Sequence, residues 1–238
     1  MRAWEPLIKV RVFACDPECT VKVVEHIMNV EYEYSDTSLL VRVCPKLREI
    51  IEKYPGLRPS LNPSMWESLV KAIVNQHVNM SLALRIISRL VVNLGMKLRT
   101  QDGEILYDFP SPEAVLRAGV TRLREMGLNR RKAEYIINIA ETIVRRGYDL
   151  EEIAKLPPHS AVEELMKFKG VGLWTAKLTY MAYTGDLNLL LSEDLSVSRG
   201  LELAGCPRKL PKEIMSYAGL LSYLAAFLYE NSKTRAKP

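Results

Sequence analysis

The stretch Leu165-Met-Lys-Phe-Lys-Gly-Val-Gly-Leu-Trp-Thr-Ala-Lys-Leu178 predicts two helices joined by a tight turn at residues 169–172. Apolar residues recur at helical spacing on both sides of the turn, with Leu165 before it and Ala176 and Tyr180 after it. The two glycines of the turn permit positive φ angles. They also leave backbone N–H groups uncovered at the start of the second helix, where an anion binds favourably.

The charge of the chain is unevenly distributed. Residues 1–44 hold five Lys/Arg against seven Asp/Glu, which leaves 28 and 21 in the remainder and a net charge of +7 there. A basic surface favours binding to a phosphate backbone, although a solvated surface is the alternative. No apolar run approaches the ~18 residues of a membrane span. The N-terminus has no signal-peptide core, so we expect a cytoplasmic protein, associated with the nucleoid of a prokaryote.

The four cysteines do not form a metal-binding pattern. Cys15 and Cys19 have a ligand-like spacing, but no Cys/His pair follows to complete a site. Buried or free thiols are therefore expected, and a Cys15–Cys19 disulfide would be an exception in a cytosol.

The pattern of the chain predicts a mainly α protein with a small N-terminal antiparallel β element, an α+β class. Residues 7–14, 20–30 and 38–44 are rich in β-branched residues and are interpreted as strands, although 20–30 also fits helix in part. His26 lies within the second of these and is interpreted as structural. After Pro45 the pattern becomes helical, and residues 96–110 are interpreted as a connector.

We expect the following division of the chain. Residues 1–44 form the β domain, and 45–62 supply a helix and a linker that belong to the helical lobes. Residues 63–185 form a helical lobe that ends in the helix-hairpin-helix at about 161–184. Residues 186–238 supply C-terminal helices that pack with the N-terminal part.

Four features follow one another in a characteristic order. They are Gln76-His77 at the end of an amphipathic helix, a basic helix opening at 128–133, the hairpin Gly170-Val-Gly172, and Glu193-Asp194 some 22 residues after the second glycine. This order resembles the helix-hairpin-helix (HhH-GPD) DNA glycosylase superfamily over residues 57–232. The resemblance implies a two-lobed helical fold with a DNA cleft between the lobes, and double-stranded DNA with damaged bases as the partner of a monomer.

The residue two positions after Gly172 distinguishes branches of this superfamily. Members that also cleave the strand carry a lysine nucleophile there, whereas this chain has Trp174. The run Gly-Leu-Trp-Thr-Ala is similar to the inducible 3-methyladenine DNA glycosylase branch, although Leu178 stands where that branch can have tyrosine. The resemblance implies base excision by water without a Schiff base. It implies no organic cofactor, and Cys206 alone cannot hold the iron–sulfur cluster of the endonuclease III branch.

The resemblance also assigns roles to single residues. Asp194 would be the catalytic carboxylate that stabilises positive charge on the sugar or activates water, or else a helix cap. Glu193 would tune the local field or cap the helix. Trp174, Tyr229 and Trp66 would line the pocket for an electron-poor base, with core packing as the alternative for each.

DNA contacts are expected from three segments. His77 would fill the gap left by the flipped base, with Gln76 as a supporting hydrogen-bond residue or a contact to the opposite strand. The hairpin Lys169, Gly170, Val171 and Gly172 would hold a phosphate and leaves room for a bound monovalent cation, with a purely structural turn as the alternative. Arg130, Arg131 and Lys132 would grip the backbone or form a solvated surface.

The sequence therefore predicts a monofunctional glycosylase that excises 3-methyladenine and 7-methylguanine in base excision repair. One alternative is a bifunctional glycosylase and lyase for oxidised purines that uses another lysine such as Lys177. The other is a non-catalytic DNA-binding protein that uses the hairpin alone.

Overall fold

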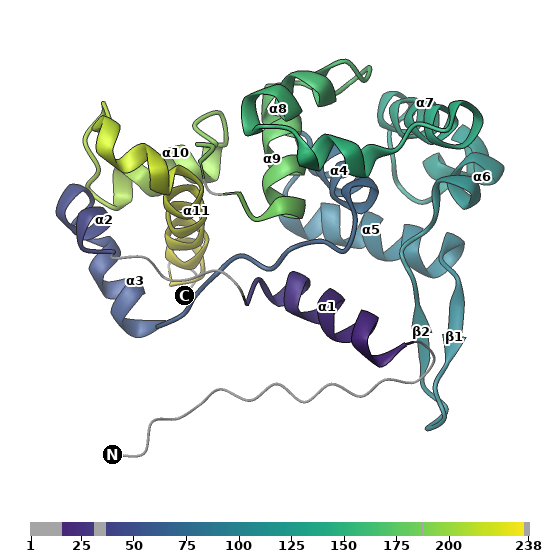
Figure 1. Cartoon of the computed structure of the whole chain (residues 1–238), viewed down its shortest axis with the longest axis horizontal. Helices are drawn as coiled ribbons and strands as arrows, with labels where there is room; N and C mark the ends of the chain where they lie inside the picture. The colour runs from purple at the N-terminus through teal and green to yellow at the C-terminus, as the bar shows by residue number, and fades with distance from the viewer. Residues whose placement is uncertain (1–15, 31–36, 187, 236–238) are drawn as a thin grey trace.

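The computed structural model describes residues 16–30, 37–186 and 188–235. Figure 1 shows two helical lobes, one containing α4–α9 and the other α2, α3, α10 and α11, with the ribbon β1–β2 projecting below the first. The elements are α1 Pro17–Met28, α2 Ser38–Val43, α3 Leu47–Lys53, α4 Met65–Asn75, α5 Met80–Leu94, β1 Lys97–Arg99, β2 Ile105–Tyr107, α6 Pro112–Glu125, α7 Arg130–Arg146, η1 Leu150–Lys155, α8 Pro158–Met166, α9 Leu173–Thr184, α10 Leu195–Leu203, η2 Lys212–Tyr217 and α11 Ala218–Arg235.

The mainly helical class is confirmed, but the predicted place of the sheet is wrong. Residues 17–28 and 38–43 are helices α1 and α2, and the predicted strand at 7–14 lies outside the described residues. Helix α1 begins at Pro17 because the Asp16 side chain accepts a hydrogen bond from the Cys19 backbone N–H at 2.8 Å. This cap outweighs the weak strand preference of the β-branched residues that follow.

The antiparallel strands lie instead in the segment interpreted as a connector. Strands β1 and β2 pair with Lys97 opposite Tyr107 and Arg99 opposite Ile105. Gly103 has φ 84° in the turn between them, a conformation that glycine adopts without strain. Each strand has only three residues, which is too short for an alternation of apolar and polar residues to predict it.

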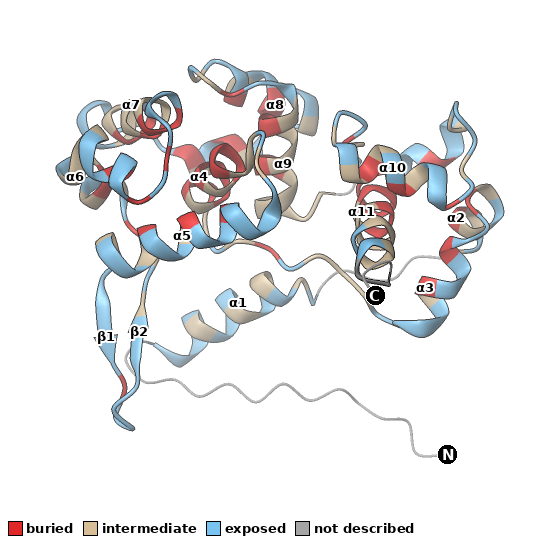
Figure 2. Cartoon of the chain, turned by 180° about the vertical axis from the view of Figure 1, so that it is seen from behind, coloured by how far each residue is buried: buried red, intermediate tan, exposed pale blue. Residues whose placement is uncertain are grey.

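The first lobe is built around α4. This helix begins at Met65 and is capped by Ser64, because the Ser64 hydroxyl accepts from the Glu67 backbone N–H. Leu69 and Ile73 are fully buried in a core shared with α5–α9. Figure 2 shows buried residues along α4, α8 and α11, while most of the β1–β2 ribbon is exposed.

The second lobe joins chain segments that are far apart in sequence. Leu40, Cys44 and Leu47 share a core with Leu220 and Leu224 of α11. Within this core Cys44 forms a disulfide with Cys206, 162 residues further on, so the prediction of free or buried thiols is wrong for this pair. Cys19 is an exposed free thiol. The N-terminal segment 40–57 thus packs with the C-terminal helices.

Helices α10 and α11 lie in close contact at Gly200. A side-chain carbon added at Gly200 of α10 would overlap the backbone carbonyl of Ala225 in α11, so only glycine permits this approach. A small cluster of Leu191, Val197 and Ala225 then packs against Trp174 and other residues of α9, and so joins the two lobes. Among the described residues, none of the helices is long and apolar enough to cross a membrane.

Candidate active site

The hairpin between α8 and α9 is held tightly on its inner side. Gly170 has φ 88°, and a side-chain carbon there would overlap the ring of Tyr135 from α7. Val171 is buried in the core of the first lobe. Glycine at position 170 is therefore required twice, by the backbone conformation and by the tyrosine that packs on it.

The outer side of the hairpin faces open space. Gly172 is the N-cap of α9 and supplies no side-chain cap, so the first N–H groups of α9 are left without a side-chain acceptor from this residue. A side-chain carbon at Gly172 would meet no described atom within 4 Å, and Lys169 and Leu173 beside it are exposed. This helix terminus can accept an anion such as a phosphate.

Trp174 and Asp194 lie side by side, although they come from different lobes. The Trp174 Nε1–H donates a hydrogen bond to Oδ2 of Asp194 at 2.9 Å. The other oxygen, Oδ1, accepts from the backbone N–H groups of Ser196 at 2.7 Å and Val197 at 3.2 Å. Asp194 is thus the N-cap of α10, and three donors also hold its half-buried carboxylate in one orientation.

Lys177 occupies the next turn of α9 after Trp174. Its Nζ donates to Oε1 of Glu193 and to the backbone carbonyl of Leu190, both at 2.9 Å. The Lys177 side chain is only 16% exposed. This ion pair ties the segment before Asp194 to α9, so Glu193 contributes to placing its neighbour.

The helix α11 closes the other side of this cluster. Ala225 packs against Val197 and Trp174 in the cluster that joins the lobes. Tyr229 lies one helical turn beyond Ala225 on the same face of α11 and is half-buried. Lys233 stands over the Tyr229 ring at 4.0 Å from its centroid.

The turn after α4 reaches the hairpin through one side chain. Gln76 Nε2 donates to the Gly170 carbonyl and to the Thr175 hydroxyl, both at 2.9 Å. The next residue, His77, is exposed and has φ 51°. Gln76 is therefore a link between two predicted DNA-contacting segments.

A sequence model of the HhH-GPD superfamily of base excision DNA repair proteins matches residues 70–221. The chain belongs to this superfamily. The matched range contains the hairpin, the Gln76-His77 turn and the Trp174–Asp194 pair, and it ends within α11.

Curated HhH-GPD relatives match at modest identity. YfjP of Bacillus subtilis (strain 168), provisionally assigned as a DNA-3-methyladenine glycosylase, is 27% identical over 129 residues, or 52% of this chain and 45% of the relative. DNA-3-methyladenine glycosylase 1 of Schizosaccharomyces pombe (strain 972 / ATCC 24843) is 27% identical over 107 residues, or 44% and 47% of the two chains. The chain spans less than half the length of the curated relatives that it matches.

Solved structures of HhH-GPD proteins share the fold. The 3-methyladenine DNA glycosylase from Archaeoglobus fulgidus matches with a TM-score of 0.74 and 29% identity, covering 90% of this chain and 75% of that one. An 8-oxoguanine glycosylase/lyase of Clostridium acetobutylicum, crystallised with double-stranded DNA, has a TM-score of 0.76 at 19% identity, covering 92% and 77%. The second likeness concerns the fold alone.

Two of the predicted site residues are buried in the first lobe. Trp66 is only 8% exposed, and its Nε1–H donates to the Pro110 carbonyl at 2.9 Å inside the first-lobe core. Lys132 is 6% exposed and its ammonium is engaged with backbone carbonyls, so it does not present its charge to DNA. A tryptophan or a lysine on an amphipathic helix is compatible with the core and with a binding surface, and the packing of neighbouring helices decides between them.

The other basic residues that were predicted to contact DNA are exposed. Arg130 forms an ion pair with Glu134 at 2.7 Å, and Arg131 beside it is exposed at the start of α7. Sequence reasoning missed two residues of this region. Tyr135 packs on Gly170, and the Thr175 hydroxyl accepts a hydrogen bond from Gln76. Tyr135 lies one turn into α7 and Thr175 directly follows Trp174, and no sequence motif marked either position as a contact of the hairpin.

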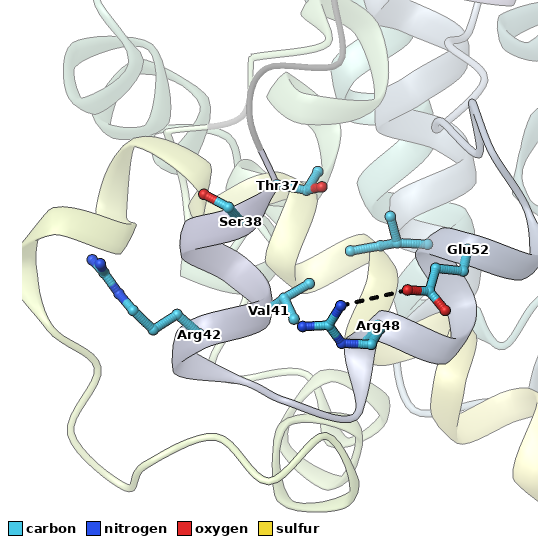
Figure 3. Close-up of a pocket in the computed structure, with 7 residues that line it drawn as sticks. Thr37, Ser38, Val41, Arg42, Arg48 and Glu52 are labelled. Atoms are coloured by element: carbon cyan, nitrogen blue, oxygen red, sulfur yellow. Dashed lines mark ion pairs between the residues drawn. The ribbon is translucent and has the colours of Figure 1, made fainter.

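Two surface hollows are lined by residues other than the predicted site residues. One of about 510 Å³ lies between α2 and α3, where Arg48 and Glu52 form an ion pair at 3.5 Å (Figure 3). Another of about 250 Å³ lies by α1, where His26 Nε2 contacts the Asn62 carbonyl at 3.0 Å. Neither is lined by Trp174 or Asp194. Among the described residues, no three His, Cys, Asp or Glu side chains are grouped to hold a metal ion.

Proposed function

We propose that this chain is a monofunctional DNA glycosylase that excises alkylated purines, 3-methyladenine and 7-methylguanine, during base excision repair. The observation that carries the proposal is the Trp174–Asp194 hydrogen bond of 2.9 Å, which sets a carboxylate at the edge of an aromatic ring. Membership of the superfamily and the DNA-3-methyladenine glycosylases among its relatives support the same activity.

Asp194 is assigned the catalytic role. As the bond from C1′ to the base nitrogen breaks, its electron pair leaves with the base and positive charge develops on the sugar. The Asp194 carboxylate stabilises this charge, water adds to C1′, and the water proton passes to the carboxylate or to solvent. A cationic alkylpurine leaves as a neutral base, so the step needs no acid to protonate it. The three N–H donors on Asp194 keep the carboxylate in place throughout.

Trp174 is assigned a wall of the base pocket. An aromatic face attracts an electron-poor, positively charged base by stacking and by a cation–π interaction. Tyr229 is assigned the second aromatic contact because it lies on the α11 face that packs toward Trp174. Trp66 is not assigned to the pocket, since it is buried and its indole N–H donates to the Pro110 carbonyl.

Double-stranded DNA is proposed to lie across the outer side of the hairpin. The N–H groups at Gly172 and the start of α9 bind a phosphate, and Lys169 adds charge. Arg130 and Arg131 contribute further contacts to the backbone from the start of α7. His77 fills the gap left by the flipped base, since it is exposed on a turn that Gln76 ties to the hairpin.

A strand-cleaving reaction fits the geometry less well. Lys177, the lysine considered as an alternative nucleophile, has its ammonium bound to Glu193 and the Leu190 carbonyl. A Schiff base requires a neutral, accessible amine. Borohydride trapping on lesion-containing DNA tests this point, and a covalent adduct with the wild-type protein would show that a lyase is present.

The central experiment measures release of methylated bases from alkylated duplex DNA by the wild type and by Asp194→Asn. We expect release of 3-methyladenine and 7-methylguanine by the wild type and a large loss in the variant, with DNA binding retained. Equal rates for the two proteins would refute the catalytic role of Asp194. Binding without release by either protein would favour a DNA-binding module.

A further inference from the structure

One buried ammonium group holds the turn between α4 and α5. Lys132 lies in the first turn of α7, and its Nζ donates to the backbone carbonyls of Val74 at 2.9 Å and Gln76 at 2.6 Å. These carbonyls lie at the C-terminal end of α4, where a helix leaves its last C=O groups without partners. The helix dipole also favours a cation at this end. A residue of α7 therefore determines how α4 ends.

The charge is costly at this place. Lys132 is only 6% exposed, and it takes part in none of the salt bridges within the described part of the chain. Desolvation lowers the pKa of its ammonium below the usual lysine value. An apolar side chain of similar size would avoid this desolvation cost but would leave the Val74 and Gln76 carbonyls without this donor. A lysine at this position thus points to a requirement other than core packing.

The acceptor residue Gln76 continues the connection. Its main-chain carbonyl is held by Lys132, while its side-chain amide reaches the hairpin at Gly170 and α9 at Thr175. The Gly170 carbonyl can only accept, so the amide nitrogen of Gln76 must face it. Lys132, Gln76 and Gly170 therefore form a continuous polar connection from α7 through the turn to the hairpin.

The residue next to this connection is held in an unusual conformation. His77 has φ 51°, the left-handed region that non-glycine residues rarely adopt. Such a conformation persists only where surrounding contacts impose it. The backbone of the preceding residue is fixed by Lys132, and its side chain is fixed by the hairpin, which accounts for the orientation of the exposed histidine.

We propose that Lys132 is a positioning residue that acts through Gln76 to hold the His77 turn at a set place relative to the hairpin. DNA then meets the gap-filling side chain and the phosphate site as one rigid unit. The proposal rests on the function assigned above, since it gives His77 a purpose in base flipping. Its structural part, however, concerns the free protein and is measurable without any DNA.

The first experiment measures amide hydrogen exchange at residues 75–79 in the free protein. Lys132→Met is the test variant, Lys132→Arg preserves the charge, and Arg145→Met changes an exposed cation near the other end of the same helix. We expect exchange in Lys132→Met to be faster by on the order of tenfold or more, with partial recovery in Lys132→Arg and no change in Arg145→Met. Unchanged exchange in a folded Lys132→Met protein would overturn the proposal.

The second experiment is a double-mutant cycle between Lys132→Met and His77→Ala, read by single-turnover base release at saturating DNA. If Lys132 acts through His77, each change lowers the rate by roughly tenfold to a hundredfold, and the two losses do not add. Fully additive losses would refute the coupling. If Lys132→Met does not fold, Gln76→Met removes the side-chain connection alone and is expected to reproduce the loss of rate; an unaltered rate would count against the proposal. Absence of release by the wild type would instead refute the proposed function, and the exchange data would still decide the structural part.

Discussion

The indole nitrogen of Trp174 lies 2.9 Å from Oδ2 of Asp194, and this hydrogen bond joins α9 of one lobe to the start of α10 in the other. The same tryptophan packs against Val197 and Ala225 beneath the carboxylate. In the proposed function, Trp174 thus offers an aromatic face to a base and a donor to the catalytic group, and it also forms a contact between lobes. Different substitutions of Trp174 remove these roles separately.

Trp174→Phe keeps an aromatic face and removes the N–H donor. A hydrogen bond to a charged group contributes about 1.5–3 kcal/mol, so we expect kcat to fall by roughly 10- to 150-fold with a smaller change in KM. Trp174→Ala should raise KM as well, because the wall of the pocket is lost. Base-release kinetics on 3-methyladenine DNA separate the two, and equal kinetic constants for Trp174→Phe and wild type would show that the indole N–H has no part in the reaction.

Trp66→Phe tests the reassignment of that residue to the core. The Pro110 carbonyl would lose its donor, and a buried unsatisfied acceptor costs about 1–3 kcal/mol. We expect a lower thermal unfolding temperature with unchanged kcat and KM at a temperature where the protein is folded. A selective change in KM for alkylated DNA would return Trp66 to the base pocket.

Gly170→Ala and Gly172→Ala form a matched pair in the hairpin. At Gly170 a left-handed backbone and the Tyr135 ring both oppose a side chain, so stability should fall by at least about 1–2 kcal/mol. At Gly172 no described atom stands in the way, so stability should be retained while affinity for DNA weakens, because the methyl group enters the phosphate site. Chemical denaturation and salt-dependent DNA binding measure the two effects, and a Gly172→Ala protein with full affinity would argue against a phosphate there.

The Cys44–Cys206 disulfide closes a loop of 162 residues. In the chain-entropy model, its loss lowers the free energy of unfolding by up to about 5 kcal/mol. We expect reduction, or Cys44→Ser with Cys206→Ser, to lower the denaturant midpoint, and Cys19→Ser to leave it unchanged since that thiol is free. An identical midpoint with and without reductant would mean that the bridge does not form in solution.

Tyr148 should limit stability at alkaline pH. Desolvation, followed by the Glu164 carboxylate that accepts its hydrogen bond at 3.0 Å, raises the pKa of Tyr148 to about 12 from 10. The unfolded chain releases this proton first, so the contribution is complete below pH 10 and is lost as pH rises toward 12. Tyr148→Phe should flatten the decline of stability across that range. Denaturation curves between these pH values compare the slopes.

Several parts of the fold follow from short-range chemistry. The Asn129 side chain caps α7 by accepting from the Lys132 backbone N–H at 2.9 Å, and Ser111 with Pro112 starts α6. The hairpin likewise follows from glycine spacing and helical periodicity. Each of these signals lies within a few residues of the structure that it specifies, because caps and turns are local hydrogen-bond events.

The sequence by itself determined the helical class, the hairpin and the superfamily, since these depend on periodicity and on motif spacing. Only the tertiary structure decided that Cys44 meets Cys206 and that Trp66 is buried. It also decided that the Lys132 ammonium points inward to the end of α4 rather than outward to solvent. The physical reason is that burial and polar pairing depend on which surfaces of distant helices meet. A helical pattern marks a face as apolar or basic, but it does not name the partner that covers it.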